Sequence, residues 1–392
     1  MKKYIYMDNA ATTPVKQEVL DEMLPYFTEK YGNPSSVYSL SSMSKRAIED
    51  SREKIANVIN ADRREIYFTA GGSEADNWAI KGIAFGNKQK GNHIITTKIE
   101  HHAVLHTCEY LGKNGFDITY LDVDEYGLID LQQLKNAITD KTILISIMYA
   151  NNEIGTIQPI KEIGEIAKSN KIYFHTDAVQ AIGNIKIDVK ELNIDALSMS
   201  AHKFYGPKGI GVLYIKQGVK IDPLISGGGQ ERNKRAGTEN VPAIVGMRKA
   251  IELAYENLDE HNEKLRKLRN YLISKIESNI DNVKLNGHPT LRLPGNVNMC
   301  FRFIEGESLL LSLDMEGIAG SSGSACTSGS LDPSHVLLAI GLPHEIAHGS
   351  LRLSLGDFNT EEEIDFVVEK LVKIVERLRM MSPLYDKNKE EK

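Results

Sequence analysis

The sequence predicts an α/β protein whose main sheet is mostly parallel. Three observations lead to this fold class. Short apolar runs rich in β-branched and aromatic residues recur between about residues 64 and 216, amphipathic stretches of helical length separate them, and long charged helical stretches replace this alternation after residue 241. Strands that alternate with helices form βαβ units. A parallel sheet built from such units is covered by helices on both faces.

The individual elements follow from these runs in order. The expected strands cover residues 65–69, 93–97, 117–123, 142–150, 172–178, 195–201 and 211–216. The expected helices of this part run from 72 through Ile83, near 103–113 and near 130–138. Each strand is short and apolar, as expected of a strand that is buried on both faces.

The C-terminal third has a different pattern. A long, charged, amphipathic helical region is expected at 241–281, and its leucines recur along one side. A strand at 296–303 follows, and a second strand-like segment lies at 352–355. Further helices are expected near 306–315 and 361–378. This mixture of long helices and few strands predicts a smaller α+β domain.

Length predicts two domains or one large domain with an appendage, because 392 residues exceed what one hydrophobic core usually serves. We expect a large domain of residues 15–260 and a small domain of residues 1–14 with 261–392. The charged tail 386–392 has nothing apolar to bury, and we assign it no function.

Composition excludes several functional classes. The net charge is −6 and the basic residues form no long run, so nucleic acid is not the expected ligand. No apolar run approaches the roughly 18 residues of a membrane span. Asp8 and Asn9 interrupt any apolar leader, and the three cysteines are odd in number and far apart. We therefore expect free thiols in a soluble, cytoplasmic protein.

A glycine-rich turn offers a phosphate site. Gly71, Gly72 and Ser73 lie between the strand at 65–69 and the helix that follows. Glycines let the backbone approach a phosphate closely, and the first N–H groups of a helix favour an anion. The alternative is an ordinary Ser N-cap with glycines for the turn.

A lysine and an aspartate are expected at neighbouring strand ends. Asp177 ends the apolar run at 172–177, and Lys203 follows the run at 195–201 beside the tight turn at Gly206–Pro207. A desolvated lysine amine can form a Schiff base, and a carboxylate can pair with a pyridinium nitrogen. Together they predict an electron-sink cofactor. The alternatives are an exposed turn lysine and a capping aspartate.

The histidines do not predict a metal site. His102 and His106 are four residues apart, as are His344 and His348, but neither pair comes with the Glu of a His-Glu-x-x-His pattern, and Cys-x-x-Cys is absent. We expect structural histidines there and no metal. His101 differs because it lies near a strand end, where an imidazole could stack on an aromatic ring or move protons.

Cys326 lies among ten successive small residues, Ser321–Ser330. A free thiol in such an exposed segment is an oxidation liability unless it is used. The alternative is a Gly/Ser linker with an incidental cysteine, whereas Cys108 and Cys300 are expected to be core residues. Arg352, on an alternating strand, could clamp a substrate carboxylate or form a salt bridge inside the fold.

Together these segments resemble the NifS/IscS class of cysteine desulfurases, which belong to the class-V aminotransferases and are fold-type I pyridoxal-phosphate enzymes. The resemblance covers nearly the whole chain and is carried by residues 6–14, 32–36, 71–77, 100–104, 151–156, 175–180, 200–209, 227–231, 235–240 and 321–330. The lysine segment is typical of the fold type, and the segment around Cys326 is specific for the desulfurases. Tyr38 stands where the class has His, and Ser73 where Thr is commoner.

The resemblance implies a role for each matching residue in binding pyridoxal 5'-phosphate. Lys203 would carry the cofactor, Asp177 would pair with its ring nitrogen, and Gln180 would hydrogen-bond its phenolic oxygen. His101 would stack on the ring and take part in proton transfer. The implied phosphate site consists of Gly72, Ser73, Ser200, His202 and, from the neighbouring subunit of an obligate homodimer, Thr238.

The resemblance also implies the substrate and the reaction. Asn152 would contact cofactor and substrate, and Arg352 would bind the carboxylate of L-cysteine. Cys326 would take the sulfur as a persulfide and pass it to an acceptor such as an iron–sulfur scaffold protein. An aminotransferase or a selenocysteine lyase on the same fold, and a non-catalytic partner-binding subunit, are the alternatives. The sequence does not name the acceptor or separate a housekeeping role from one dedicated to nitrogenase.

Overall fold

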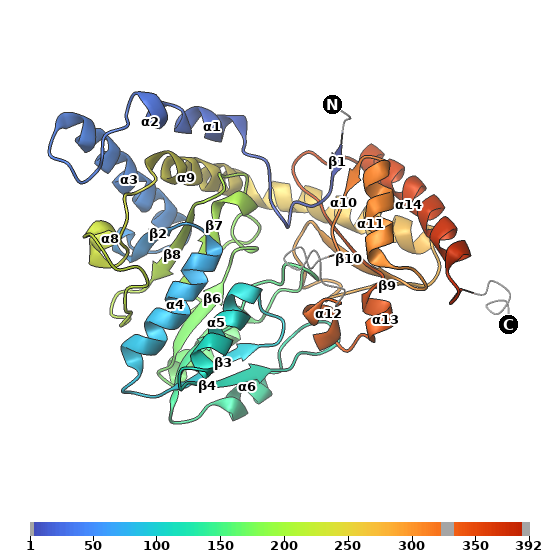
Figure 1. Cartoon of the computed structure of the whole chain (residues 1–392), viewed down its shortest axis with the longest axis horizontal. Helices are drawn as coiled ribbons and strands as arrows, with labels where there is room; N and C mark the ends of the chain where they lie inside the picture. Colours follow the sequence, from blue (N-terminus) through green and yellow to red (C-terminus); the bar gives the residue numbers. More distant parts are fainter. Residues whose placement is uncertain (1–3, 323–332, 386–392) are drawn as a thin grey trace.

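The computed structural model describes residues 4–322 and 333–385, and its centre is a seven-stranded sheet (Figure 1). The strands are β2 (Ile66–Thr69), β3 (His93–Thr97), β4 (Asp117–Leu121), β5 (Thr142–Ser146), β6 (Tyr173–Asp177), β7 (Ala196–Ser200) and β8 (Gly211–Ile215). Their order is β2-β8-β7-β6-β5-β3-β4, and within this sheet only β8 runs antiparallel to its neighbours. The predicted α/β class with a mostly parallel sheet is confirmed. The antiparallel strand was not predicted; it follows a tight turn instead of a crossover helix.

Helices cover both faces of this sheet. One face packs against α1 (Gln17–Met23), α3 (Ser39–Val58), α7 (Ile160–Ser169) and α9 (Val241–Glu256), and the other against α4 (Gly72–Asn87) and α5 (His102–Gly112). Side chains alternate between the faces along each strand: on β5, Leu144 packs on the α4 side and Ile145 on the opposite side. Short helices α2 (Pro25–Thr28), α6 (Leu131–Ala137), α8 (Gln230–Asn233) and the 3-10 turns η1 (Arg63–Glu65) and η2 (Ala201–Lys203) complete this part.

The C-terminal part has its own sheet and hydrophobic cluster. Strands β9 (Val283–Leu285), β10 (Asn296–Phe301) and β12 (Ser350–Ser354) form an antiparallel sheet, and β1 (Ile5–Tyr6) pairs in parallel with β11 (Ile318–Ala319). The helices are α10 (Leu258–Asn279), α11 (Gly306–Met315), α12 (His335–Ala339), α13 (His344–Ala347) and α14 (Glu361–Met381). Met7 packs into this cluster, so the N-terminal segment lies beside the C-terminal elements (Figure 1). A separate core supports the two-domain division, which stays a prediction.

The structure corrects one expected element and adds others. The helical region at 241–281 is two helices, α9 and α10, because Asn257 leaves the helical conformation between them (φ −131°, ψ 39°). The long helix α3 was not predicted from the sequence, and neither was α12. In the part of the chain that the structure describes, no helix combines the length and apolar character needed to cross a membrane.

A small fourth cluster joins the two parts. Val336 and Leu337 of α12 pack with Ile99 and Met148 of the large part. Helix α12 is therefore held against the end of the central sheet where β3 and β5 give way to loops. This contact places the start of α12 at the edge of the site described below.

Candidate active site

A cavity of about 310 Å³ opens beyond the carboxyl ends of β6 and β7, beside the start of α4. Ligands of open α/β sheets bind at this edge. The predicted site residues that line it are Gly72, Ser73, His101, Asn152, Asp177, Gln180, Ser200, His202, Lys203 and Arg352. Thr238 is exposed and lies outside this lining, and Cys326 lies outside the described residues. One chain thus gathers all the predicted groups that the structure describes, apart from Thr238.

One end of the cavity suits an anion. Helix α4 begins at Gly72, and a Cβ on this residue would lie 2.7 Å from Cγ2 of Val179, so only glycine allows this close approach. Gly71, with no side-chain cap bond, precedes the helix, and Ser73 lies inside its first turn. The alternative of a Ser73 N-cap is therefore wrong. The free N–H groups and positive end of a long helix face this part of the cavity.

Ser200 and His202 lie across from the start of α4. Ser200 ends β7, and His202 lies in η2 directly after it. Burial, and then the charge of Lys203, lower the pKa of His202 to about 4. Its Nδ1 lies 3.1 Å from the Thr12 hydroxyl. A neutral imidazole at this place can offer one N–H to an anion without adding a permanent charge.

Lys203 is half-buried and points into the cavity. Its amine donates hydrogen bonds to the carbonyl oxygens of Ala10 (2.7 Å) and Ala11 (2.8 Å). Gln180 also donates to the Ala10 carbonyl, at 2.9 Å. The alternative of an exposed turn lysine is therefore wrong. The N-terminal segment holds the amine at the strand end where a carbonyl cofactor would reach it.

Asp177 ends β6 and is 6% exposed. Its Oδ1 accepts a hydrogen bond from the Val179 backbone N–H at 2.9 Å. Burial raises the pKa of this carboxyl, and the Val179 N–H and the Lys203 charge oppose the rise. Asp177 therefore provides a buried negative charge within reach of a cationic ring nitrogen in the same cavity.

His101 is the N-cap residue of α5 and lines the cavity. Its Nδ1 accepts the Ala103 backbone N–H at 3.1 Å, so in the neutral ring the proton sits on Nε2. Burial, and then the positive charge of Lys203, lower the pKa of His101 to about 4. The ring is uncharged at neutral pH, which suits both stacking on an aromatic ring and accepting a proton.

Arg352 on β12 is only 2% exposed and makes the internal salt bridge that the sequence left open. Its Nη2 lies 2.8 Å from Oδ1 of Asp8, and its Nη1 donates to the Asn152 carbonyl at 2.9 Å. The guanidinium still lines the cavity. A pre-formed ion pair keeps this planar group oriented before any substrate carboxylate arrives.

Several lining residues were not predicted as site residues. The titratable ones are Asp76, His102, Glu153 and His335. Asp76 and Glu153 lie inside the segments 71–77 and 151–156, so their position in these motifs was the available signal. The ring of His102 lies 5.0 Å from that of His106 and 4.7 Å from that of His335, between centroids. Among the described residues, no group of three or more His, Cys, Asp or Glu side chains is arranged to hold a metal ion.

Comparison with known proteins now decides the family. The model of the aminotransferase class-V family matches residues 5–367. The chain is 66% identical, over its full length and theirs, to proteins named cysteine desulfurase IscS from Clostridium botulinum. The chain belongs to the NifS/IscS cysteine desulfurases.

Three further proteins extend the comparison. A protein named cysteine desulfurase IscS from Methanosarcina thermophila is 64% identical, over 98% of this chain and 95% of that one. The solved structure of a NifS-like protein superimposes with a TM-score of 0.90 at 42% identity, covering 96% of this chain and all of the other. A structure described as SspA in complex with cysteine gives a TM-score of 0.80 at 40% identity, over 91% and 99% of the two chains.

The cofactor of these desulfurases is pyridoxal 5'-phosphate, and the cavity fits it. The glycine-lined helix start with Ser73 can hold the phosphate, while Lys203 can hold the aldehyde carbon. Asp177 supplies the negative charge that a protonated ring nitrogen needs. The volume of about 310 Å³ lies at the small end of the range for ligand pockets.

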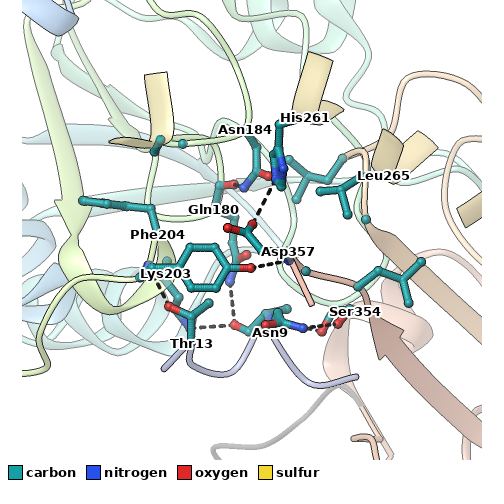
Figure 2. A pocket seen from close by; sticks show the side chains of 18 of the residues that line it. Asn9, Thr13, Gln180, Asn184, Lys203, Phe204, His261, Leu265, Ser354 and Asp357 are labelled. Atoms are coloured by element: carbon teal, nitrogen blue, oxygen red, sulfur yellow. Dashed lines mark hydrogen bonds and ion pairs between the residues drawn. The ribbon is translucent and has the colours of Figure 1, made fainter. Parts of the chain in front are cut away.

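A second cavity of about 220 Å³ lies on the other side of Lys203, next to the start of α10 (Figure 2). Lys203 and Gln180 line both cavities and so form the wall between them. In Figure 2, His261 and Asp357 point toward one another; His261 Nε2 lies 3.5 Å from the Asp357 carboxylate, whose other oxygen lies 2.5 Å from the Lys16 amine. Among the described residues, Asp357 is the one carboxylate that lines this second cavity, and the Lys16 amine already neutralises it. We assign the second cavity no role in the reaction.

Proposed function

We propose that this chain takes the sulfur of L-cysteine onto Cys326 and releases L-alanine. One observation carries the proposal: described residues on both sides of the segment that contains Cys326 contact residues that line the cavity. Ser321 pairs through its backbone with Arg352, and Ser334 donates a hydrogen bond to Glu153 at 2.5 Å. Cys326 follows Ser322 by four residues, which span at most about 14 Å when extended. This chain length supports the proposal that the thiol can reach the cavity.

The proposed reaction needs a thiol as well as the cofactor. The Cys326 thiolate attacks the substrate sulfur, the bond from that sulfur to the substrate β-carbon breaks, and its electron pair stays on the carbon side. Protonation there completes L-alanine, and Cys326 keeps the sulfur as a persulfide. The cofactor, when bound, withdraws electrons so that the substrate α-proton can leave.

The side chains of this chain take the following roles in that proposal. Lys203 holds the cofactor and then moves protons at the substrate α-carbon, with His101 as a second proton carrier. Gln180 reaches the phenolic oxygen, and Asn152 contacts cofactor and substrate. Arg352, kept in place by Asp8, binds the substrate carboxylate.

The remaining roles involve other chains. We propose a homodimer in which the exposed Thr238 completes the phosphate site of the partner. The persulfide sulfur goes to an acceptor protein, of which an iron–sulfur scaffold is our first candidate. A persulfide chemistry requires reduced thiols, and we therefore place the enzyme in the cytoplasm.

Replacing Cys326 by Ser tests this proposal. We expect the variant to lose persulfide and alanine formation from L-cysteine while it keeps the cofactor absorbance near roughly 400 nm. Cys108→Ala is the matched control because Cys108 is buried in the core and does not line the cavity, so it should retain activity. Undiminished alanine release by Cys326→Ser would reject the transfer of sulfur to Cys326, whereas conversion of L-cysteine into its 2-oxo acid would favour transamination, which needs no protein thiol.

A further inference from the structure

The floor of the cavity contains a second carboxyl group, Asp76, that the proposed reaction does not use. Asp76 lies on α4, three residues after Ser73. It lines the cavity and is 1% exposed. Its charge would interact first with Asp177 and then with Glu100. Burying a carboxyl group costs free energy unless it is paired or neutralised.

A chain of buried polar side chains leads to Asp76. The Ser146 hydroxyl lies 2.9 Å from Nδ1 of His175, and Nε2 of His175 lies 3.0 Å from the Ser198 hydroxyl. Ser198 in turn interacts with Asp76 and opposes the rise of its pKa. These serines and His175 are fully buried on β5, β6 and β7, on the side that packs against α4.

Strand register explains how this chain of contacts arises. Ser146 is paired with His175, and Ser198 with Asp177. Two residues earlier on the same strands, the same side carries Leu144, Tyr173 and Ala196, which pack in the apolar cluster. The side chains change from apolar to polar only at the last positions before the cavity. Placing such a network in a dry interior is costly, which points to a function at this end of the sheet.

Geometry decides which of the two carboxyls carries the negative charge. Asp177 accepts the Val179 backbone N–H and faces Lys203, which both favour its ionised form. Asp76 has only Ser198; its Oδ1 has no hydrogen-bond partner and lies 3.6 Å from Nε2 of His175. His175 brings no charge because burial lowers its pKa to about 3. Burial, and then the nearby Asp177, raise the pKa of Asp76 well above its ordinary value.

We propose that Asp76 is a positioning residue that stays protonated beneath the cavity, so that the ring nitrogen of the cofactor meets the single negative charge of Asp177. Ser198, His175 and Ser146 hold Asp76 in place. A second negative charge near the ring would repel the electrons that the ring withdraws from the substrate. A neutral Asp76 therefore preserves the electron-withdrawing power of the site. This inference rests on the proposed cofactor site, and it adds a residue that sets the charge there.

Infrared spectroscopy of the cofactor-free enzyme tests the protonation directly. At pH 7 we expect wild type to show the carbonyl stretch of a protonated carboxyl that Asp76→Asn loses, while the exposed control Asp122→Asn keeps it. The wild-type-minus-variant spectrum isolates Asp76 from Glu100 and Glu153, two other buried carboxyls. No loss in Asp76→Asn means that Asp76 is ionised, and it overturns the inference.

Two more measurements complete the test. In the loaded enzyme, raising the pH should ionise Asp76 and shift the cofactor absorbance in wild type, and Asp76→Asn should lack this step; identical titrations in both would overturn the inference. Ser198→Ala, which removes only the hydroxyl, should move the Asp76 band to higher frequency. The cofactor-free spectrum does not depend on desulfuration. If the Asp76 band is missing and Cys326→Ser is inactive, only the role of Asp76 is refuted. If the Asp76 band is present and Cys326→Ser still releases alanine, only the proposed reaction is refuted.

Discussion

The two walls of the cavity are built in different ways. On the wall that the large part provides, Asp177 and Ser200 end their strands, Lys203 lies in the turn after β7, and α4 begins shortly after β2. On the opposite wall, Arg352 is oriented by Asp8, which is 344 residues away in the chain, and α12 is held by contacts to the large part. The first wall is set by local sequence and the second by how the two parts pack. Cofactor binding and substrate binding should therefore be separable by mutation.

Lys203→Ala should have the largest effect. The change removes both the amine that binds the cofactor covalently and a group that carries protons. We expect activity to fall by at least about 1,000-fold. The cofactor should no longer become attached after borohydride reduction, as measured by the mass of the intact chain. Lys208→Ala is the matched control, since Lys208 is exposed in the same turn. A chromophore that stays attached to the reduced Lys203→Ala chain would contradict the assignment of Lys203.

Arg352→Lys should affect the other wall alone. The change keeps a positive charge near Asp8 but loses the planar fork that binds a carboxylate with two hydrogen bonds. We expect the KM for L-cysteine to rise about 10- to 100-fold, which corresponds to about 1.4–2.7 kcal/mol, with an unchanged cofactor absorbance. Steady-state kinetics and an absorbance spectrum measure both. Arg379→Lys, a buried arginine of α14 that holds the Arg302 and Asp281 carbonyls, should leave KM unchanged. A loss of cofactor in Arg352→Lys would mean that the two walls are coupled.

The same contrast explains what the sequence could predict. The mostly parallel sheet, its strand ends and the residues that follow them could be predicted, because apolar runs and glycine turns are local signals. The Asp8–Arg352 ion pair could not, since neither residue carries a local sign of its partner. Helices α3 and α12 were also missed. The five-residue α12 has too short a pattern to recognise, and its position depends on the cluster with Ile99 and Met148.

The last expected effect concerns the stability of the fold, not the activity, and again separates the two parts. Glu100 in the large part is fully buried; its Oε1 accepts bonds from the Thr97 hydroxyl (2.8 Å) and the Met148 N–H (3.0 Å), while Oε2 has no partner. Burial raises its pKa from 4.5 to about 8. Glu305 in the small part caps α11 by accepting the N–H groups of Glu307 and Ser308, and these bonds lower its pKa, although partial burial opposes them.

The two carboxyls should therefore give pH dependences of opposite sign. Between pH 4.5 and 8 the folded chain keeps a proton on Glu100 that the unfolded chain has lost. The contribution of Glu100 to the free energy of unfolding is therefore lost as pH rises, by up to about 1.4 kcal/mol per pH unit. Glu305 contributes above its unfolded pKa and loses that contribution as pH falls through its lower folded pKa. Urea unfolding from pH 4 to 8 should show Glu100→Gln gaining stability relative to wild type as pH rises, and Glu305→Gln losing less than wild type as pH falls. A Glu100→Gln curve parallel to wild type would show that Glu100 is ionised in the fold, and that its surroundings are wetter than its burial indicates.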